Sequence, residues 1–298
     1  MISLTIPRKI AFLTIFLALA LTACAGPSGL NLVLPTLTST PAPTPTATPV
    51  PLAISVNGEG IPIPEFEAEL ARYQQAQSAL GNTVSLETAT KAVSDEVIDT
   101  LLLAQGAAAD GYNVDDAALQ SRIDSLVTQI GGADKLTAWQ AAQGYTDADF
   151  RSDLRRQMAA AFMRDKIAAS VPATAEQVHV KQILLYNADA AQQALSYLKA
   201  GWNFNDLAAQ YDPVTKGELG WFPHGYLPDS AIEAAAFALQ PGQYSDIIQT
   251  QAGYEILFVV ERDPAHPLSP DARLTLQEHA LQDWLTQQRN TSKILFAP

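Results

Sequence analysis

The chain of 298 residues is 48% hydrophobic and 16% charged, so it has enough apolar surface for one or two packed cores. Its 31 acidic side chains outnumber 18 basic ones, and the formal charge of −13 disfavours binding to nucleic acid or electrostatic docking on anionic lipid. The single cysteine excludes an internal disulfide framework and a cysteine-rich zinc site.

The amino terminus has the pattern of a lipoprotein signal. Arg8 and Lys9 precede an apolar run, residues 10–20, which is too short for a permanent membrane-spanning helix of about 20 residues. The run leads into Leu21-Thr22-Ala23-Cys24, which resembles a bacterial lipobox, where cleavage leaves the cysteine as the lipid-modified first residue. We expect a signal peptide over residues 1–23 and a lipid on Cys24 that anchors an extracytoplasmic protein to the bacterial cell membrane. The alternatives are an ordinary signal peptide and an uncleaved anchor.

Residues 24–53 are predicted to form a tether. Residues 25–57 contain no charged side chain, and residues 35–51 are rich in proline and threonine. Proline fixes φ and removes a hydrogen-bond donor, so this stretch is expected to be extended and polyproline-like. At about 3.1 Å per residue, such a spacer would hold a folded part several nanometres from the membrane.

The pattern over residues 54–171 predicts a helical domain. Apolar side chains recur at helical spacing, Pro64 and Asp115 stand where helices begin, and Gly111 stands where one ends. Thr146 and the acids after it favour another helix start. Helices are expected from Pro64 onward and over residues 86–110, 115–130, 134–143 and 147–170.

Residues 174–263 show a different pattern, which predicts an α+β domain on an antiparallel or mixed sheet. Residues 212–228 form a connection that is rich in glycine and proline. Strands are expected over residues 177–186, 244–249 and 254–261, and helices over residues 188–199, 204–211 and 229–238.

Residues 268–290 contain a last amphipathic helix, which begins at Pro270. Its apolar residues are expected to share one side, and a solitary helix has to bury such a stripe. We therefore expect this helix to pack back on the N-terminal helices through Leu274, Leu281, Trp284 and Leu285.

Several blocks of the α+β part occur in a fixed order. They are Gln182-Ile183-Leu184, residues 198–208, Gly217-Glu218-Leu219-Gly220-Trp221-Phe222, residues 235–242, and Thr250-Gln251-Ala252-Gly253-Tyr254. Together they resemble a parvulin-type (PpiC-like, or rotamase) peptidyl-prolyl isomerase domain. The segments Val56-Asn57-Gly58 and Pro64-Glu65-Phe66, with the C-terminal helix, resemble the chaperone domain of SurA/PrsA-like foldases.

The resemblance implies an α+β fold class. It comprises a helical SurA-N-like chaperone domain, a parvulin-like α/β domain with a small four-stranded sheet, and a C-terminal helix that returns to the helical domain. Its implied activity is cis–trans isomerisation of X–Pro peptide bonds, which needs no cofactor. Rotation of the amide faces a barrier of about 18–20 kcal/mol because the twisted bond loses resonance.

An isomerase of this type needs an apolar cup for the proline ring and polar groups that favour the twisted amide. The resemblance assigns the cup to Phe222, Leu227 and Phe237, where Leu227 replaces the family's usual methionine. Each of these is also an ordinary type of core residue, so a structural role is the alternative.

The polar half of the site departs from the family's pattern. Gln182 and Glu255 occupy the positions of the two strand histidines, and the loop after Tyr211 is shorter than usual. Asp212 matches the family's Asp/Cys position, and Thr250 matches the threonine that joins the histidine network. Gln182, Thr250 and Glu255 are expected to form a hydrogen-bonded chain, and burial of Glu255 would raise its pKa unless it is paired.

The sequence is compatible with three functions. The first is a lipid-anchored foldase that isomerises X–Pro bonds in newly exported proteins, with all seven site residues on one concave surface. The second is a holdase chaperone that binds unfolded clients and carries a degenerate parvulin domain, and the third is an assembly or secretion factor for one partner. No metal is expected, because the histidines are scattered at no ligand spacing: His179, His224, His266 and His279.

Overall fold

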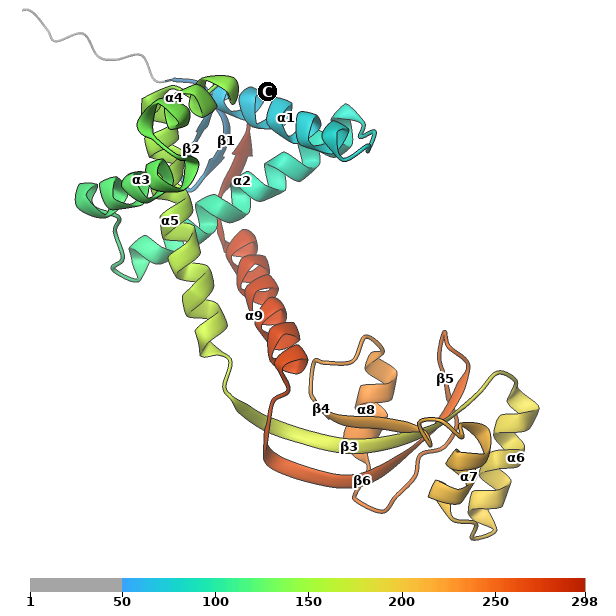
Figure 1. Ribbon diagram of the computed structural model, residues 1–298. Coiled ribbons are helices and arrows are strands. Elements are labelled where there is room, and N and C mark those ends of the chain that lie inside the picture. Colours follow the sequence, from blue (N-terminus) through green and yellow to red (C-terminus); the bar gives the residue numbers. More distant parts are fainter. Residues whose placement is uncertain (1–49, 298) are drawn as a thin grey trace, which may run out of the picture. The chain divides into compact units, whose positions relative to one another are not determined.

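The computed structural model describes residues 50–297 (Figure 1). The predicted signal peptide, Cys24 and the tether up to residue 49 lie outside the described residues. No helix among residues 50–297 is long and apolar enough to cross a bilayer. The strands are β1 (Leu52–Val56), β2 (Glu59–Pro62), β3 (Thr174–Leu185), β4 (Glu218–Pro223), β5 (Ile248–Gln249), β6 (Tyr254–Pro267) and β7 (Ile294–Phe296). The helices are α1 (Ile63–Ala79), α2 (Leu86–Ala109), α3 (Asp116–Ile130), α4 (Ala133–Ala142), α5 (Asp147–Ser170), α6 (Ala188–Lys199), α7 (Phe204–Tyr211), α8 (Ser230–Ala238) and α9 (Pro270–Thr291).

Side-chain caps begin the N-terminal helices close to where the sequence predicts them. Asp115 Oδ1 accepts a hydrogen bond from the Ala118 amide at 2.7 Å, and Thr146 Oγ1 accepts one from the Asp149 amide at 3.1 Å. Such bonds satisfy amide groups that the first turn of a helix leaves unpaired. The predicted helices of this region are present as α1 to α5.

A small antiparallel sheet in the order β2-β1-β7 brings together the two ends of the described chain. Asn57 (φ 55°) and Gly58 (φ 92°) form the turn between β1 and β2, both in the left-handed region that an Asn-Gly turn requires. β7, which the sequence does not predict, pairs with β1 so that Ile54 lies opposite Phe296. Since β1 begins at Leu52, the last two residues of the predicted tether belong to this sheet.

The second sheet has the order β4-β3-β6-β5, and all its neighbouring strands are antiparallel. β3 and β6 pair from Thr174 opposite Pro267 to Leu185 opposite Tyr254 (Figure 1). β4 lies in the connection where the sequence predicts no strand, because Gly220 (φ 79°) interrupts the alternation of side chains. The predicted four-stranded sheet is confirmed.

Hydrophobic clusters cover both faces of this sheet. Ile183 and Ile256 belong to the cluster that includes α6 and α7, and Val180 belongs to the one that includes α8. Because successive side chains of a strand alternate between faces, Gln182 and Glu255 point to the α8 face. The sheet therefore presents the two polar site positions on the side that α8 covers.

Helix α9 returns to the N-terminal helices, as predicted. Leu281 and Trp284 share a cluster with residues of α2 and α5. A Cβ at Gly106 of α2 would lie 2.7 Å from the Trp284 ring, so only glycine allows this ring to pack so closely. The prediction for Leu274 is wrong, because its side chain is 56% exposed, and Ala272 is the buried residue in the first turn.

Candidate functional site

The three predicted apolar site residues lie in one cluster on the α8 face of the sheet. Phe222 lies on β4, Phe237 on α8 and Leu227 in the loop between them. The rings of Phe222 and Phe237 are 6.2 Å apart at 74°, a favourable edge-to-face geometry. Phe222 is only 1% exposed, so it forms the floor of the cluster, while Leu227 and Phe237 are half-buried.

Two polar side chains contact Phe237. The imidazole ring of His224 stacks on it with the centroids 3.4 Å apart. The guanidinium carbon of Arg262 lies 5.6 Å from the ring centroid, within the range of a cation–π interaction, and Arg262 also donates to the Phe237 carbonyl. His224 and Arg262 therefore both lie against the ring of Phe237.

Glu233, which the sequence analysis does not single out, holds the loop that carries Leu227. Its carboxylate accepts hydrogen bonds from the amides of Gly225 at 2.8 Å, Tyr226 at 3.2 Å and Leu227 at 3.3 Å. An acidic residue in the first turn of a short helix, directly after a glycine-containing loop, is the sequence signal for such a clamp.

Of the hydrogen-bonded series predicted for Gln182, Thr250 and Glu255, only the contact between Thr250 and Glu255 is present. Thr250 Oγ1 lies 2.8 Å from Glu255 Oε1, and Glu255 is only 6% exposed. Burial raises the pKa of Glu255 above its ordinary value, the hydrogen bond from Thr250 opposes this, and the charge of Asp229 adds to it.

Gln182 stands apart from this hydrogen bond. The β3–β6 register places it opposite Leu257, so Glu255 is its diagonal neighbour, at about 7–8 Å for such a pair. Within residues 50–297 no hydrogen bond joins the Gln182 side chain to Thr250 or Glu255.

Gln182 instead lines a cleft of about 270 Å³ together with Asp212. The Asp212 carboxylate accepts hydrogen bonds from the amides of Val214 at 3.0 Å and Thr215 at 3.1 Å and from the Thr215 hydroxyl, and these bonds hold its pKa below the ordinary value. The exposed tyrosines Tyr186 and Tyr211, which the sequence analysis does not select, also line the cleft.

Gly217 shapes the wall of this cleft. It has a φ of 72°, and a Cβ on it would lie 2.0 Å from the Gln182 carbonyl oxygen. Its own carbonyl accepts a hydrogen bond from the Gln182 amide at 2.7 Å. The short loop after α7 is therefore held directly against β3, and only glycine fits there.

The seven predicted residues thus fall into three groups rather than one surface. Gln182 and Asp212 line the cleft, Thr250 and Glu255 form a pair, and the apolar residues form the cluster beneath α8. Gln182, Glu255 and the apolar cluster share the same face of the sheet. Within residues 50–297 no group of three or more His, Cys, Asp or Glu side chains is arranged to hold a metal ion.

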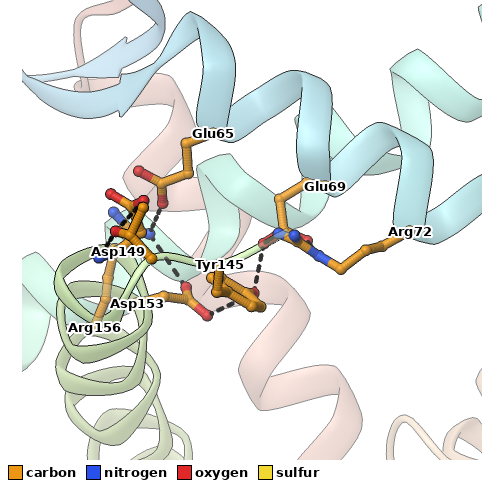
Figure 2. Close-up of polar contacts among 8 residues, drawn as sticks. Glu65, Glu69, Arg72, Tyr145, Asp149, Asp153 and Arg156 are labelled. Atoms are coloured by element: carbon orange, nitrogen blue, oxygen red, sulfur yellow. Dashed lines mark hydrogen bonds and ion pairs between the residues drawn. The ribbon is translucent and has the colours of Figure 1, made fainter. Parts of the chain in front are cut away.

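A larger cavity, of about 680 Å³, lies among the N-terminal helices α1, α2 and α5. Its lining combines apolar side chains with a network of charged groups (Figure 2). The sequence analysis assigns none of these charged residues to a site, because charged positions on helices are usually solvated.

Fold and motifs together define a parvulin-type isomerase domain accompanied by a SurA-like helical domain. A family model described as PPIC-type PPIase domain matches residues 157–272, and one described as SurA-like N-terminal domain matches residues 6–164, more than half of the chain. The chain belongs to the SurA/PrsA-like family, which confirms the resemblance seen in the sequence.

Two named relatives and one solved structure are similar to this chain. The chain is 26% identical over 225 residues to the foldase protein PrsA of Bacillus subtilis, covering 72% of this chain and 73% of the relative. It is 28% identical over 190 residues to the chaperone SurA of Dechloromonas aromatica, covering 51% of this chain but only 42% of that protein. A crystal structure of the peptidylprolyl isomerase PrsA from Bacillus cereus is 20% identical, covers 81% of this chain and 86% of its own, and has a TM-score of 0.44.

Proposed function

We propose that this protein is an extracytoplasmic foldase, anchored by a lipid on Cys24, that isomerises X–Pro bonds in newly exported proteins. The observation that carries the proposal is the cluster of Phe222, Leu227 and Phe237 on the sheet face that also holds the Thr250–Glu255 pair. The proposed division is a tether over residues 24–53, a chaperone-like domain over 54–171, an isomerase domain over 174–263 and the helix of residues 268–290.

The chemistry of this site rests on the change of the amide during rotation. A twisted amide has less charge separation than a planar one, so an apolar enclosure around the proline ring favours it. Glu255, with its raised pKa, is the polar group that can exchange hydrogen bonds with the amide as it turns, with Thr250 holding its orientation. No proton has to be transferred and no cofactor is needed.

Two-dimensional ¹H NMR exchange spectroscopy on short X–Pro peptides measures the rate of cis–trans exchange and tests this activity. The full chain should raise the cis–trans exchange rate above that in buffer, and Phe237→Ala should remove most of the increase. Trp202→Ala, an exposed aromatic in the α6–α7 connection, is the matched control and should leave the rate unchanged. An exchange rate equal to that in buffer, for a chain with an unchanged circular dichroism spectrum, overturns the isomerase proposal.

The lipid anchor has its own test. Metabolic labelling with a radioactive fatty acid should mark the chain, and Cys24→Ala should abolish the label and release the protein from the membrane fraction. A label that persists in Cys24→Ala would contradict the anchor and leave the activity proposal untouched.

The second candidate is client holding without turnover, and the burial of Phe222 together with the side chains that contact Phe237 favours it. In that case the chain should suppress aggregation of an unfolded protein while the X–Pro exchange rate stays at the buffer value. Loss of both activities in the intact chain would exclude both candidates.

A further inference from the structure

The cavity among α1, α2 and α5 has two chemically different sides. Val93 and Val97 of α2 and Tyr73 and Ala76 of α1 form an apolar side. The volume of about 680 Å³ is in the range of pockets that hold ligands the size of a few peptide residues.

Charged side chains from α1 and α5 form the other side (Figure 2). Arg156 of α5 is ion-paired with Glu65 and, at 3.2 Å, with Asp153, and all three side chains are largely buried. Arg72 is ion-paired with Glu69 and donates to the Gln143 carbonyl at 2.7 Å. Both guanidinium groups of the cavity are therefore occupied by partners within the protein.

The cavity has an excess of negative charge. The lining contains four acidic side chains, Glu65, Glu69, Glu96 and Asp153, and two basic ones, Arg72 and Arg156. Glu96, which is exposed on α2, has no ion-pair partner among residues 50–297. The hydroxyl of Tyr145 donates to Glu69 at 3.0 Å. Burial is the largest cause of the raised pKa of Tyr145; the charges of Asp153 and Glu69 add to it, and Arg72 opposes it.

We propose that this cavity binds an unfolded polypeptide segment in which a Lys or Arg side chain stands beside apolar side chains. The apolar side chains would contact Val97 and Tyr73, and the cation would lie against the carboxylates, with Glu96 at the rim. A small cation alone would leave the apolar side unused, and a purely apolar segment would leave the excess charge uncompensated. This site deepens the proposed foldase function, since it specifies which client segments the helical domain selects.

Binding of short fluorescein-labelled peptides without proline, followed by fluorescence anisotropy, tests the site on the full chain in detergent. One peptide carries Lys between two Leu residues, a second has Glu in place of Lys, and a third has Ser in place of both Leu. The first should bind most tightly, and its affinity over the second should fall as salt screens the charges.

Matched variants locate the binding. Ala76→Trp fills the cavity from an exposed helix position and should weaken the first peptide about tenfold or more, whereas Ala79→Trp on the same helix should not. Glu96→Gln should reduce the preference for Lys over Glu by about threefold, whereas Glu67→Gln, exposed on α1 outside the cavity, should not.

Equal binding by Ala76→Trp and Ala79→Trp, each with an unchanged thermal midpoint, would overturn the cavity as the binding site. If Glu96→Gln and Glu67→Gln lowered the preference for the Lys peptide over the Glu peptide equally, that preference would come from the net charge of the chain. This result would overturn the proposed selectivity of the cavity. The peptides contain no proline, so their binding does not depend on isomerase activity. If the chain fails to isomerise X–Pro bonds, only the isomerase proposal is contradicted. If it fails to bind these peptides, only the proposed site is contradicted.

Discussion

The α8 face of the sheet and the cavity among α1, α2 and α5 both enclose carboxylates, but under opposite electrostatic conditions. Glu255 on the sheet has a hydroxyl partner, Thr250, and burial raises its pKa. Glu65 in the helices has the guanidinium of Arg156 as its partner. Burial favours the neutral form of the first carboxyl, whereas the second has a guanidinium group directly beside it. The sheet is thus suited to an uncharged amide, and the helical cavity to a charged side chain.

The largest expected effect comes from emptying the core of the sheet. Phe222→Ala removes a ring that is 1% exposed and should lower the free energy of unfolding by about 3–5 kcal/mol, measured by urea denaturation. Leu274→Ala, at an exposed position of α9, should change it by less than about 0.5 kcal/mol. Equal losses in the two variants would show that Phe222 is not part of a packed core.

Breaking the charge pairing of the helical region should cost less. Arg156→Met leaves the largely buried Glu65 and Asp153 without their cation and should lower the free energy of unfolding by about 2 kcal/mol. Its neighbour Arg155 pairs with Asp116 on the surface, so Arg155→Met should cost no more than about 1 kcal/mol. Denaturation curves of the two variants that coincide would contradict the distinction between the sites.

The loop clamp on the sheet side is expected to contribute less again. Glu233→Gln removes the charge that accepts the amides of Gly225, Tyr226 and Leu227 and should lower the free energy of unfolding by about 1 kcal/mol. Glu261→Gln, at an exposed position of β6, is the control. A clamp variant as stable as this control would show that the three amides find equivalent partners elsewhere.

The smallest expected effect is a change in how steeply the free energy of unfolding varies with pH. Because the pKa of Glu255 is raised from 4.5, the folded protein binds this proton more tightly than the unfolded chain does. Its contribution to stability therefore declines as the pH rises from 4.5 through the raised pKa, and Glu255→Gln should remove that decline from the profile of unfolding free energy against pH.

The pKa of Asp212 is shifted in the opposite direction, so its effect on stability should have the opposite pH dependence. The Thr215 hydroxyl and backbone amides lower its pKa from 3.8, so its contribution is lost as the pH falls below that value. Asp212→Asn should flatten the acidic limb of the same profile and leave the decline above pH 4.5 unchanged. If Glu255→Gln and Asp212→Asn altered the same limb, the assignment of burial to one and exposure to the other would be wrong.

Local signals predict the helices well. The expected ranges 188–199 and 204–211 coincide with α6 and α7, and in the structure the side chains of Asn187 and Asn203 cap these two helices. Alternation also places Gln182 and Glu255 on one face of the sheet. Leu274 has the right spacing for the buried stripe of α9 but lies near the helix start, where the supporting helices no longer cover it.

Features that depend on distant segments are not predictable in the same way. β7 is a short strand whose existence depends on the edge of β1 being available, which no local pattern reports. The hydrogen bond between Gln182 and Thr250 fails because the strand register sets Gln182 opposite Leu257. The cavity of the helical region combines residues from three helices, so its excess of carboxylates becomes visible only when those helices are assembled.

The pairing of β7 with β1 has a consequence for how the molecule is made. The helical part is interrupted in the chain, whereas the four-stranded sheet occupies one continuous stretch, residues 174–267. A nascent chain emerges amino end first, so it can complete the four-stranded sheet before Trp284 and Ile294 are available. At that stage α2 and α5 lack the packing that these two residues provide. Until residues 284–294 have emerged, the polypeptide carries a complete four-stranded sheet and a helical part whose apolar surface is exposed to other chaperones.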